Sequence, residues 1–436
     1  MSLPRCLCEF HTCQLMLRSR ALTTMSRRCI SSRVTMHPNA VAHLLPADTL
    51  LEEEKNPDYD PKRFYPAQIG ETVNGKYQII SKLGFGTGST VWLAEEMNRW
   101  PWQSSKYMAL KITNCFEGDW KSANEELQMP RHISQIQLED EGGKYVRVAE
   151  DSFVVMGPFG EHLCLVFEPL REPLWMLGRH LGTVGLSAPI LKAFLKLILK
   201  GLDFLHSECH IIHTDLKADN FLIGFEDSLV IVEYVKAQIQ NPGPYKEGDG
   251  RRVYQSQPDF GRFTKGTGVL KISDFGAAVF GDTTRLHYHD IQPEQFAAPE
   301  VLLGAGWTNS ADIWNLGMVL WELLEDISLL DGVGPENQYD RHVHFAQMIR
   351  ILGPPPVELL GRANKEVYAS LSSEQGEFRH PHLMSPEDFT SESKTPSLQG
   401  EDKRLFIEFA RRMLKWLPEE RATARELYED PWLSSP

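Results

Sequence analysis

The sequence predicts an α+β protein of two lobes, with a small strand-rich lobe before a larger, mainly helical one. Three observations support this prediction. Residues 77–167 contain short apolar runs separated by turns, which is typical of strands. Leucines and isoleucines recur at helical spacing from residue 191 to 205. Between these regions, the apolar run 163–167 leads into Glu168-Pro169-Leu170, as expected for a hinge between lobes.

Length and charge limit the classes of function. A chain of 436 residues exceeds one average domain and suits two lobes with an extension. The net charge is −14, from 45 basic and 59 acidic residues, which argues against nonspecific nucleic-acid binding and is compatible with a basic partner. No apolar run reaches the ~18 residues needed to cross a bilayer. We therefore expect a monomer that binds neither nucleic acid nor membranes directly.

The first 58 residues are expected to form an Arg/Ser-rich extension and linker that is disordered or serves in targeting. Residues 1–47 contain six Arg, no Lys and one acidic residue, Glu9, a composition similar to a mitochondrial transit peptide. An unstructured N-terminal tail explains the same composition equally well. A proline- and charge-rich linker follows, so we divide the chain into the extension 1–58, a small lobe 59–170 and a large lobe 171–436.

The small lobe contains two features suited to phosphate chemistry. A glycine-rich turn, residues 84–88, lies between two strand-like runs, and glycine allows backbone amides to approach phosphate oxygens. Lys111 interrupts the apolar strand 107–112 and needs an anionic partner there. Glu125 or Glu126, at the beginning of a predicted helix, can supply that partner; a plain hairpin and a surface lysine are the alternatives.

The large lobe contains the loop His213-Thr214-Asp215-Leu216-Lys217-Ala218-Asp219-Asn220, which follows the β-like pair 211–212. Its Asp, Lys and Asn bring an acceptor, a cation and an amide oxygen into one small volume, an arrangement that suits phosphoryl transfer. Asp274-Phe275-Gly276 follows the next strand, 269–273, and adds a further carboxylate.

Two polar segments interrupt the helical lobe. The first, about 225–268, is predicted to be a surface insertion with a helix near 229–238. The second, about 354–400, is predicted to be a long loop. Between them, Ser310-Ala311-Asp312 is predicted to cap the apolar helix 313–324.

The glycine turn, the strand lysine, the helix glutamate, the His-x-Asp loop and Asp-Phe-Gly occur in one order, and together they resemble a eukaryotic protein kinase over about residues 65–433. The sequence is most similar to serine/arginine-rich protein kinases (SR-protein kinases) of the CMGC group, and among these to compact fungal members. The similarity is carried by Tyr65-Pro66, Ile69-Gly70-Glu71, Asn74-Gly75-Lys76-Tyr77, the run 89–93, His213-Thr214-Asp215, the run 170–175 and the run 201–210.

The resemblance implies a bilobal kinase fold and a role for each motif residue. Asp215 would orient the substrate hydroxyl, Lys217 would neutralise the γ-phosphate, and Lys111 would pair with Glu126, which matches the family's register better than Glu125. Asn220 and Asp274 would hold Mg²⁺. The residues implied to bind ATP are Gly84, Phe85, Gly86, Thr87, Gly88, Ser89, Val91, Ala109, Lys111, Phe167, Glu168, Leu170, Asn220 and Asp274.

The resemblance also implies supports for the site. Asp312 would brace the catalytic loop, and Glu300, at the end of the activation segment, would pair with Arg421. Thr214 replaces the arginine that usually pairs with a phosphorylated activation loop, so activity is expected without that phosphorylation. Pro293 and Ala297 replace a Thr and an Arg of the usual pattern, which puts substrate positioning in question.

We therefore predict an ATP- and Mg²⁺-dependent serine/threonine protein kinase, with Arg/Ser-rich proteins as the candidate substrate class. A pseudokinase acting as a binding or scaffold module is the alternative. Four acidic residues could receive a basic substrate or form a solvated loop: Asp326, Asp331, Glu336 and Asp340. The expected location is the cytoplasm or nucleus, or the mitochondrion if the Arg-rich start is a transit peptide.

Overall fold

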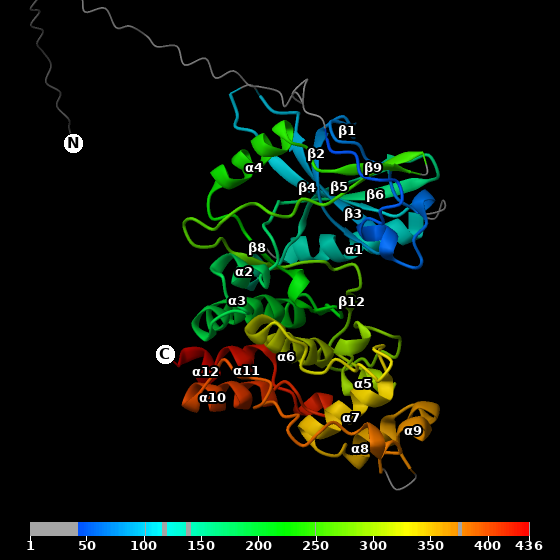
Figure 1. Cartoon of the computed structure of the whole chain (residues 1–436), viewed down its shortest axis with the longest axis vertical. Coiled ribbons are helices and arrows are strands. Elements are labelled where there is room, and N and C mark those ends of the chain that lie inside the picture. Colours follow the sequence, from blue (N-terminus) through cyan, green and yellow to red (C-terminus); the bar gives the residue numbers. More distant parts are fainter. Residues whose placement is uncertain are drawn as a thin grey trace, which may run out of the picture.

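The computed structural model describes residues 42–435, except for 101, 116–119, 137–140, 249 and 374–376, and the side chains of 120–126 lie outside the description. The small lobe is a six-stranded antiparallel sheet in the order β1-β2-β3-β4-β6-β5, with helix α1 beside it (Figure 1). Its elements are β1 (Thr72–Val73), β2 (Tyr77–Gly86), β3 (Ser89–Glu96), β4 (Tyr107–Thr113), α1 (Trp120–Ile136), β5 (Ala149–Met156) and β6 (Glu161–Phe167).

The alternation of side chains gives this sheet two different faces. In β4, Met108, Leu110 and Ile112 belong to one buried apolar cluster, so Ala109 and Lys111 lie on the opposite face. Trp92 of β3 pairs with Leu110 and belongs to the same cluster. Lys111 is therefore directed to the face of the sheet that does not carry this cluster.

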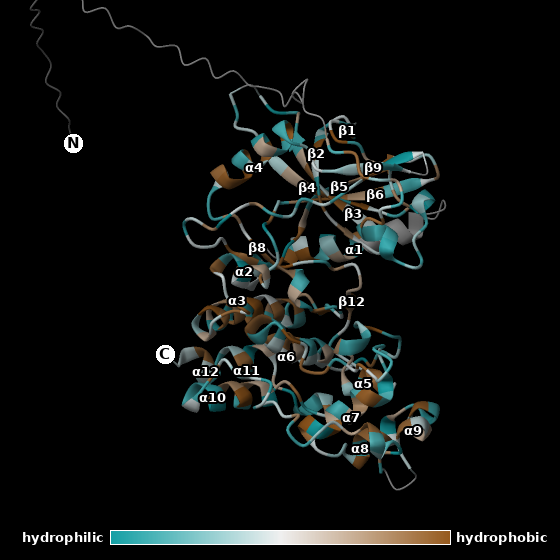
Figure 2. Cartoon of the chain, in the orientation of Figure 1, coloured by the Kyte–Doolittle hydropathy of each residue, from teal (hydrophilic) through white to brown (hydrophobic). Residues whose placement is uncertain are grey.

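The large lobe is built around two buried helices, α3 (Ala188–Ser207) and α6 (Ser310–Glu325), and hydrophobic residues recur along its helices in Figure 2. Burying both faces of such helices against their neighbours supplies the main stabilisation of this lobe. The remaining helices are α2 (Met176–Leu181), α5 (Pro299–Leu302), α7 (Arg341–Leu352), α8 (Val357–Arg362), α9 (Lys365–Leu371), α10 (Gly400–Arg411), α11 (Ala424–Tyr428) and α12 (Pro431–Ser434).

The predicted long loop at 354–400 needs correction, because α8 and α9 interrupt it. Leu359, Leu360 and Leu371 are buried in the core of the large lobe. Each helix has seven residues or fewer, so neither covers enough turns for a helical period to be recognised among the surrounding Pro and Ser residues.

Two small antiparallel ladders frame the predicted catalytic loop. β7 (Ile211–Ile212) pairs with β12 (Val279–Phe280) before the loop, and β8 (Phe221–Ile223) pairs with β11 (Leu270–Ile272) after it. The loop is therefore fixed at both ends by backbone hydrogen bonds.

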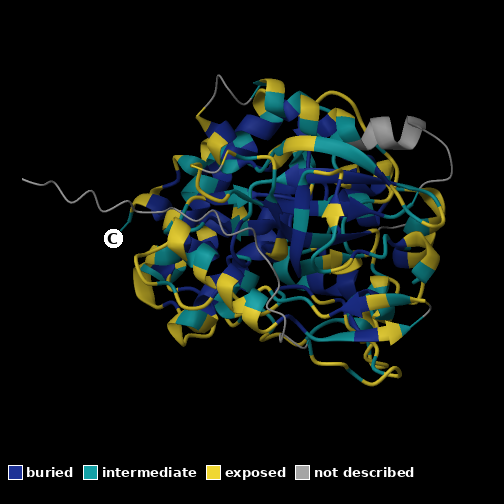
Figure 3. Cartoon of the chain, turned by 90° about the horizontal axis from the view of Figure 1, so that it is seen from above, coloured by how far each residue is buried: buried dark blue, intermediate teal, exposed yellow. Residues whose placement is uncertain are grey.

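The predicted insertion lies against the small lobe, although the sequence places it within the large one (Figure 1). It contains α4 (Ser228–Gln240), which includes the predicted helix, and the hairpin β9 (Tyr245–Gly248) and β10 (Arg251–Tyr254). Ile231 and Tyr234 of α4 are buried against the small lobe's Ile80. Seen from above, buried residues form the centre of this lobe (Figure 3).

The described part of the N-terminal extension is also packed. Leu44 and Leu45 pair with Tyr245 of the insertion hairpin, and residues 52–55 form a 3₁₀ turn in which Glu53 is buried. The expectation of a disordered linker is therefore corrected for this part of residues 42–58. Its partners in the insertion, Tyr245, Lys246 and Ser256, are distant in the sequence and supply burial that its local sequence does not indicate.

None of the helices in the described part of the chain combines the length and apolar character needed to span a membrane.

Candidate active site

The catalytic loop is held by the buried carboxylate of Asp312, at the beginning of α6. Its Oδ2 accepts the backbone N–H of His213 at 2.8 Å, and its Oδ1 accepts that of Thr214 at 2.8 Å. His206 Nε2 lies 2.8 Å from Oδ2. This arrangement agrees with the brace implied by the resemblance. It corrects the predicted capping role of Ser310-Ala311-Asp312, because these residues already belong to α6, whose N-cap residue Asn309 makes no side-chain cap hydrogen bond.

The three polar residues of the loop lie together. Lys217 Nζ is 2.9 Å from Asp215 Oδ2, and Asn220 Nδ2 donates to the Asp215 carbonyl at 2.7 Å. The side chains of Asp215 and Lys217 are 21% and 32% exposed, so a substrate can reach both. A carboxylate and an ammonium group at this separation can receive a hydroxyl and a phosphate oxygen at neighbouring positions.

Lys111 and Asp274 connect the two lobes. Lys111 Nζ, from β4, is 2.7 Å from Asp274 Oδ1, which follows β11. Burial raises the pKa of Asp274, but the positive charge of Lys111 and its hydrogen bond outweigh that effect and lower the pKa to about 2. Asp274 therefore remains a carboxylate at neutral pH.

The predicted pairing of Lys111 with Glu126, preferred over Glu125, lies outside the described side chains. Both positions lie on α1, whose helical backbone is described there, but their side chains lie outside the described part of the chain. The anionic partner that the structure gives Lys111 is Asp274.

The residues predicted to surround ATP lie on adjacent strands and at the hinge. Gly84, Phe85 and Gly86 end β2 and pair with Val91, Thr90 and Ser89 of β3, so Thr87 and Gly88 form the turn. The carbonyl of Gly88 accepts the backbone N–H of Asn114 at 2.8 Å. Ala109 of β4 pairs with Phe167 at the end of β6, and Glu168 and Leu170 follow directly.

Arg147 is a buried hinge residue that the sequence analysis missed. Its Nη2 donates to the Glu168 carbonyl at 2.7 Å, and its guanidinium lies 4.7 Å from the centre of the Phe167 ring. Burial lowers the pKa of Arg147 to about 10, although Glu168 and Asp274 act in the opposite direction. No local motif marks this arginine, since its partners are distant in sequence.

The activation segment is held by hydrogen bonds between uncharged groups near both of its ends. The hydroxyl of Thr214 donates to the Ala277 carbonyl at 2.8 Å, and Gly281 N donates to the His210 carbonyl at 2.9 Å. Further along, His287 and Trp307 exchange two backbone hydrogen bonds, and their rings stack with centres 4.6 Å apart. These contacts fix the segment at both ends.

Gln292 is a second residue that the sequence analysis missed. It has a left-handed backbone, with φ of 69°, and its amide donates to the Ala311 carbonyl and to Asn315 Oδ1. Its Oε1 accepts the Ala298 N–H at 2.9 Å. Gln292 therefore fixes the short stretch that contains Pro293 and Ala297, the two positions where the sequence departs from the usual kinase pattern.

The expected pair between Glu300 and Arg421 is present. Arg421 Nη1 donates to Glu300 Oε1 and Arg421 Nη2 donates to Glu300 Oε2, each at 2.6 Å, and neither side chain is exposed. A paired, fully buried contact of this kind connects the end of the activation segment to the last part of the large lobe.

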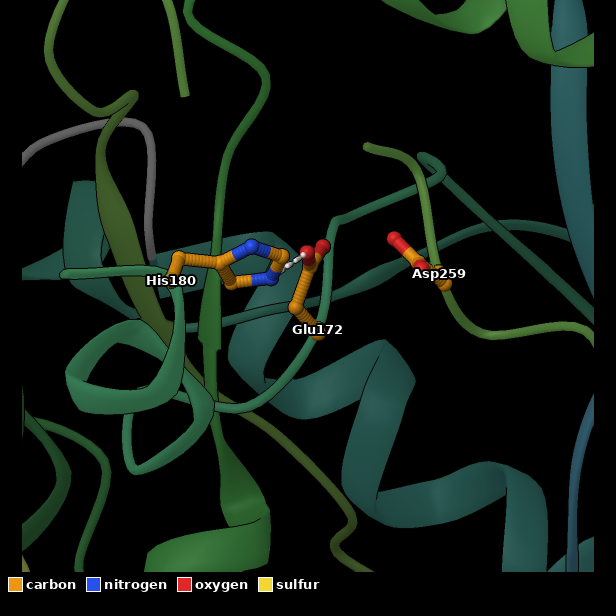
Figure 4. Close-up of side chains that lie close together, drawn as sticks. All are labelled: Glu172, His180 and Asp259. Atoms are coloured by element: carbon orange, nitrogen blue, oxygen red, sulfur yellow. Dashed lines mark ion pairs between the residues drawn. The ribbon is translucent and has the colours of Figure 1, made fainter. Parts of the chain in front are cut away.

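Two groups of polar side chains in the described residues are candidates for a metal site. One is the predicted pair Asn220 and Asp274. The other is the cluster of Glu172, His180 and Asp259, whose ligand atoms lie within 4.8 Å of one another (Figure 4). In this cluster, Glu172 already binds the Arg171 guanidinium and His180. The positive charge of Arg171 would repel a metal cation bound to the same carboxylate, which makes this cluster the poorer metal site.

Comparison with known proteins gives consistent matches. The model of the protein kinase domain family matches residues 77–433. A serine/threonine protein kinase of Aspergillus fumigatus is 37% identical over 395 residues, covering 89% of this chain and 92% of that protein. Serine/threonine-protein kinase SRPK of Physarum polycephalum is 31% identical over 409 residues, covering 88% and 92%.

More distant matches agree with these. SRSF protein kinase 3 of Mus musculus is 24% identical over 541 residues, covering 92% of this chain and 94% of that protein. The crystal structure of a kinase domain superposes with a TM-score of 0.62 at 24% identity, covering 86% of this chain and all of the other. This last similarity concerns the fold alone.

Proposed function

This chain belongs to the protein kinase domain family and is a serine/threonine protein kinase, and we propose that it phosphorylates Arg/Ser-rich proteins with Mg²⁺ and ATP. Two groups of contacts carry the proposed chemistry: Asp215 with Lys217 and Asn220, and Lys111 with Asp274, at 2.7 to 2.9 Å. The groups are joined next to Asp274, where Ser273 N donates to the Asn220 carbonyl at 2.8 Å. Because all five residues are present, no described feature favours the alternative of a pseudokinase.

Each of these residues has a proposed role. Asp215 accepts a hydrogen bond from the substrate hydroxyl and orients it, and Lys217 neutralises charge on the transferred phosphate. Lys111 binds the α- and β-phosphates under the glycine-rich turn. Positioning and charge neutralisation provide most of the catalysis, since the protein forms no bond to the phosphoryl group.

The family implies ATP and a divalent metal, and we propose Mg²⁺ on Asn220 and Asp274. The residues fit this ion. Asp274 remains ionised, with its pKa lowered to about 2, and its side chain is 47% exposed. The amide nitrogen of Asn220 is engaged by the Asp215 carbonyl, so its oxygen is the ligand atom of that side chain. Bound Mg²⁺ would neutralise charge on the phosphates.

The proposed preference for arginine-rich substrates is supported by acidic groups beside the catalytic loop. Burial, helped by the negative charges of Asp219 and Asp326, raises the pKa of Glu322 to about 7, despite a backbone hydrogen bond from Ala218 and the charge of Lys217. Three carboxyl groups therefore crowd one place, and a guanidinium from a substrate would relieve their repulsion. Relatives named SRPK and SRSF protein kinase support the same class.

The structure gives different surroundings to the four acidic residues that were predicted either to receive a basic substrate or to form a solvated loop. Asp331 accepts Gln347 Nε2 at 2.7 Å, and Asp340 caps α7 through the His342 N–H. These two carboxylates therefore stabilise their own loop, whereas Asp326 and Glu336 are exposed. The proposal rests on the group around Glu322.

Substrate preference can be measured with three peptides of equal length, containing Arg-Ser, Lys-Ser or Gln-Ser repeats. We expect kcat/KM to be highest for the Arg-Ser peptide and lowest for the Gln-Ser peptide. Asp219→Asn should lower kcat/KM for the Arg-Ser peptide by roughly tenfold, because the exposed Asp219 carboxylate no longer attracts a guanidinium, and leave the Gln-Ser peptide unchanged. Equal rates on all three peptides would contradict the preference.

Asp215→Ala tests the chemistry itself. We expect kcat to fall by at least about 10²-fold, the usual contribution of a positioned base, while the melting temperature and the affinity for ATP stay close to those of the unaltered chain. Glu208→Ala, on the exposed end of α3, is the matched control and should retain full activity. Substantial phosphate transfer by the Asp215→Ala protein would exclude this role.

We also propose that activity does not depend on activation-loop phosphorylation. The hydrogen bond from Thr214 to Ala277 and the pairing of β7 with β12 support this, because they hold the segment through uncharged groups.

The cellular location stays a prediction: cytoplasm or nucleus, or the mitochondrion if residues 1–47 are cleaved as a transit peptide. Sequencing the mature N-terminus would decide between these.

A further inference from the structure

Lys82 lies in β2, two residues before the glycine-rich turn begins, and its side chain is 1% exposed. Its Nζ is 2.6 Å from Glu53 Oε2 and 2.8 Å from Glu52 Oε2, and it donates to the Tyr254 carbonyl at 2.9 Å. A buried ammonium is tolerated when its donors are all occupied, and three acceptors match its three N–H groups. We name these four residues the lid anchor.

The partners of Lys82 come from two remote segments. Glu52 and Glu53 belong to the 3₁₀ turn of the N-terminal extension, and Tyr254 ends strand β10 of the insertion. The two segments are also tied to each other, since Glu54 pairs with Lys246 at 2.9 Å and Ser256 donates to Glu52 through both its N–H and its hydroxyl. The anchor is therefore a junction of three parts of the chain.

The insertion holds the backbone of β2 as well. Gln257 N donates to the Lys82 carbonyl at 2.8 Å. Tyr234 of α4 contacts Ser81 Oγ at 3.0 Å and donates to the Gln257 carbonyl at 2.7 Å. The insertion therefore contacts β2 at two consecutive residues, through the side chain of Ser81 and the main chain of Lys82.

The position of Lys82 connects the anchor to the glycine-rich turn. Lys82 pairs with Trp92, so it lies on the face of the sheet opposite Lys111. The strand is irregular between Lys82 and Gly84, where the pairing register shifts by one residue. Such an irregularity bends a strand and redirects the residues after it, so fixing Lys82 sets the direction of the glycine-rich turn from behind.

We propose that Lys82 is a positioning residue for ATP binding, and that the lid anchor holds the glycine-rich turn over the phosphates. This inference rests on the proposed nucleotide site. The apparent dissociation constant for ATP is the intrinsic one divided by the fraction of molecules with the turn in place. Breaking the anchor lowers that fraction, so affinity for ATP falls while the catalytic loop, in the other lobe, is unaffected.

The test compares Lys82→Met and the milder Glu53→Gln with the unaltered full chain. ATP binding is measured by titration, and steady-state rates are measured with varied ATP and with varied peptide. If the competent fraction falls to about a tenth, both Kd and KM for ATP rise roughly tenfold, whereas kcat and the KM for peptide change less than about twofold. Lys82→Arg, which keeps the charge, should restore most of the affinity.

Lys192→Met provides the matched control for simple destabilisation. Lys192 is also a buried lysine, on α3 in the large lobe, and it pairs with Asp402 at 2.8 Å. It should lower the melting temperature without raising the Kd for ATP. The inference is overturned if Lys82→Met and Glu53→Gln bind ATP as tightly as the unaltered chain, or if Lys192→Met weakens binding equally. Failure of the unaltered chain to bind ATP would overturn the proposed function as well.

Discussion

The catalytic loop and the glycine-rich turn are both held by a buried charged side chain, but the two anchors differ in what surrounds the charge. Asp312 gathers the N–H groups of two consecutive loop residues and the ring of His206, all close to the core of one lobe. Lys82 gathers two carboxylates and a carbonyl from segments about 30 and 170 residues away. The first anchor is internal to the large lobe, and the second depends on long-range docking.

This difference predicts different failures. Removing Asp312 leaves two loop N–H groups in the core without their acceptor, which disturbs the position of Asp215 directly. Removing Lys82 leaves two carboxylates together, which loosens the docked extension and insertion. The first change should impair the chemical step, and the second should impair nucleotide binding.

The largest effect is expected for Asp312→Ala. Misplacing a reacting group by about 1 Å can cost 10²-fold in rate, so kcat should fall by about that factor, with the KM for ATP little changed. The matched control is Asp203→Ala, which removes an aspartate of the same lobe whose partner is the exposed Arg425. If Asp312→Ala weakened ATP binding and left kcat normal, the proposed difference between the two anchors, chemistry for Asp312 and nucleotide binding for Lys82, would be wrong.

A smaller effect, on the pH dependence of stability, is expected from the carboxyl group of Glu322. It also lies beside the catalytic loop but has fewer hydrogen-bond donors around it than Asp312. It accepts the Ala218 N–H at 3.4 Å, and burial raises its pKa to about 7. The folded chain therefore binds this proton more tightly than the unfolded chain, so its contribution to stability falls as pH rises from about 4.5 to 7. Relative to Glu322→Gln, the unaltered chain should lose on the order of 2 kcal/mol across that range.

Chemical denaturation of both proteins at pH 5, 6, 7 and 8 measures this difference. Asp402→Asn, a carboxyl of the large lobe that is paired with Lys192, provides the comparison. A stability difference between the unaltered chain and Glu322→Gln that stays constant over this range would show that Glu322 is already ionised, and would remove the crowding argument for arginine-rich substrates.

The smallest effect is expected for Thr214→Val, which keeps the shape of the side chain and removes its hydrogen bond to Ala277. One such bond is worth about 1 kcal/mol, so kcat should fall roughly fivefold. Thr284→Val lies in the same segment, where the hydroxyl binds the neighbouring Asp282, and should change little. Phosphatase treatment should leave the unaltered enzyme active; loss of activity would show that a phosphate, and not Thr214, orders the segment.

Much of the active site could be predicted because its residues stand in short motifs. Asp215, Lys217 and Asn220 occupy one loop, and Asp274 begins a three-residue motif, so local spacing already limits their geometry. Arg147 and Gln292 could not be found in this way. Each contacts backbone atoms of residues that are not its sequence neighbours, and any arginine or glutamine has the same local appearance.

The sequence by itself determined the two-lobed fold, the family and the candidate residues for phosphate transfer, because strand alternation, helical periodicity and motif spacing are local signals. The tertiary structure alone decided that the insertion and the N-terminal extension join the small lobe. It also decided that Ser310-Ala311-Asp312 does not cap α6, whereas the contact of Asp312 with the catalytic loop was already implied by the resemblance. A buried charge is placed by the partners that compensate its desolvation, and those partners come together only when distant segments pack.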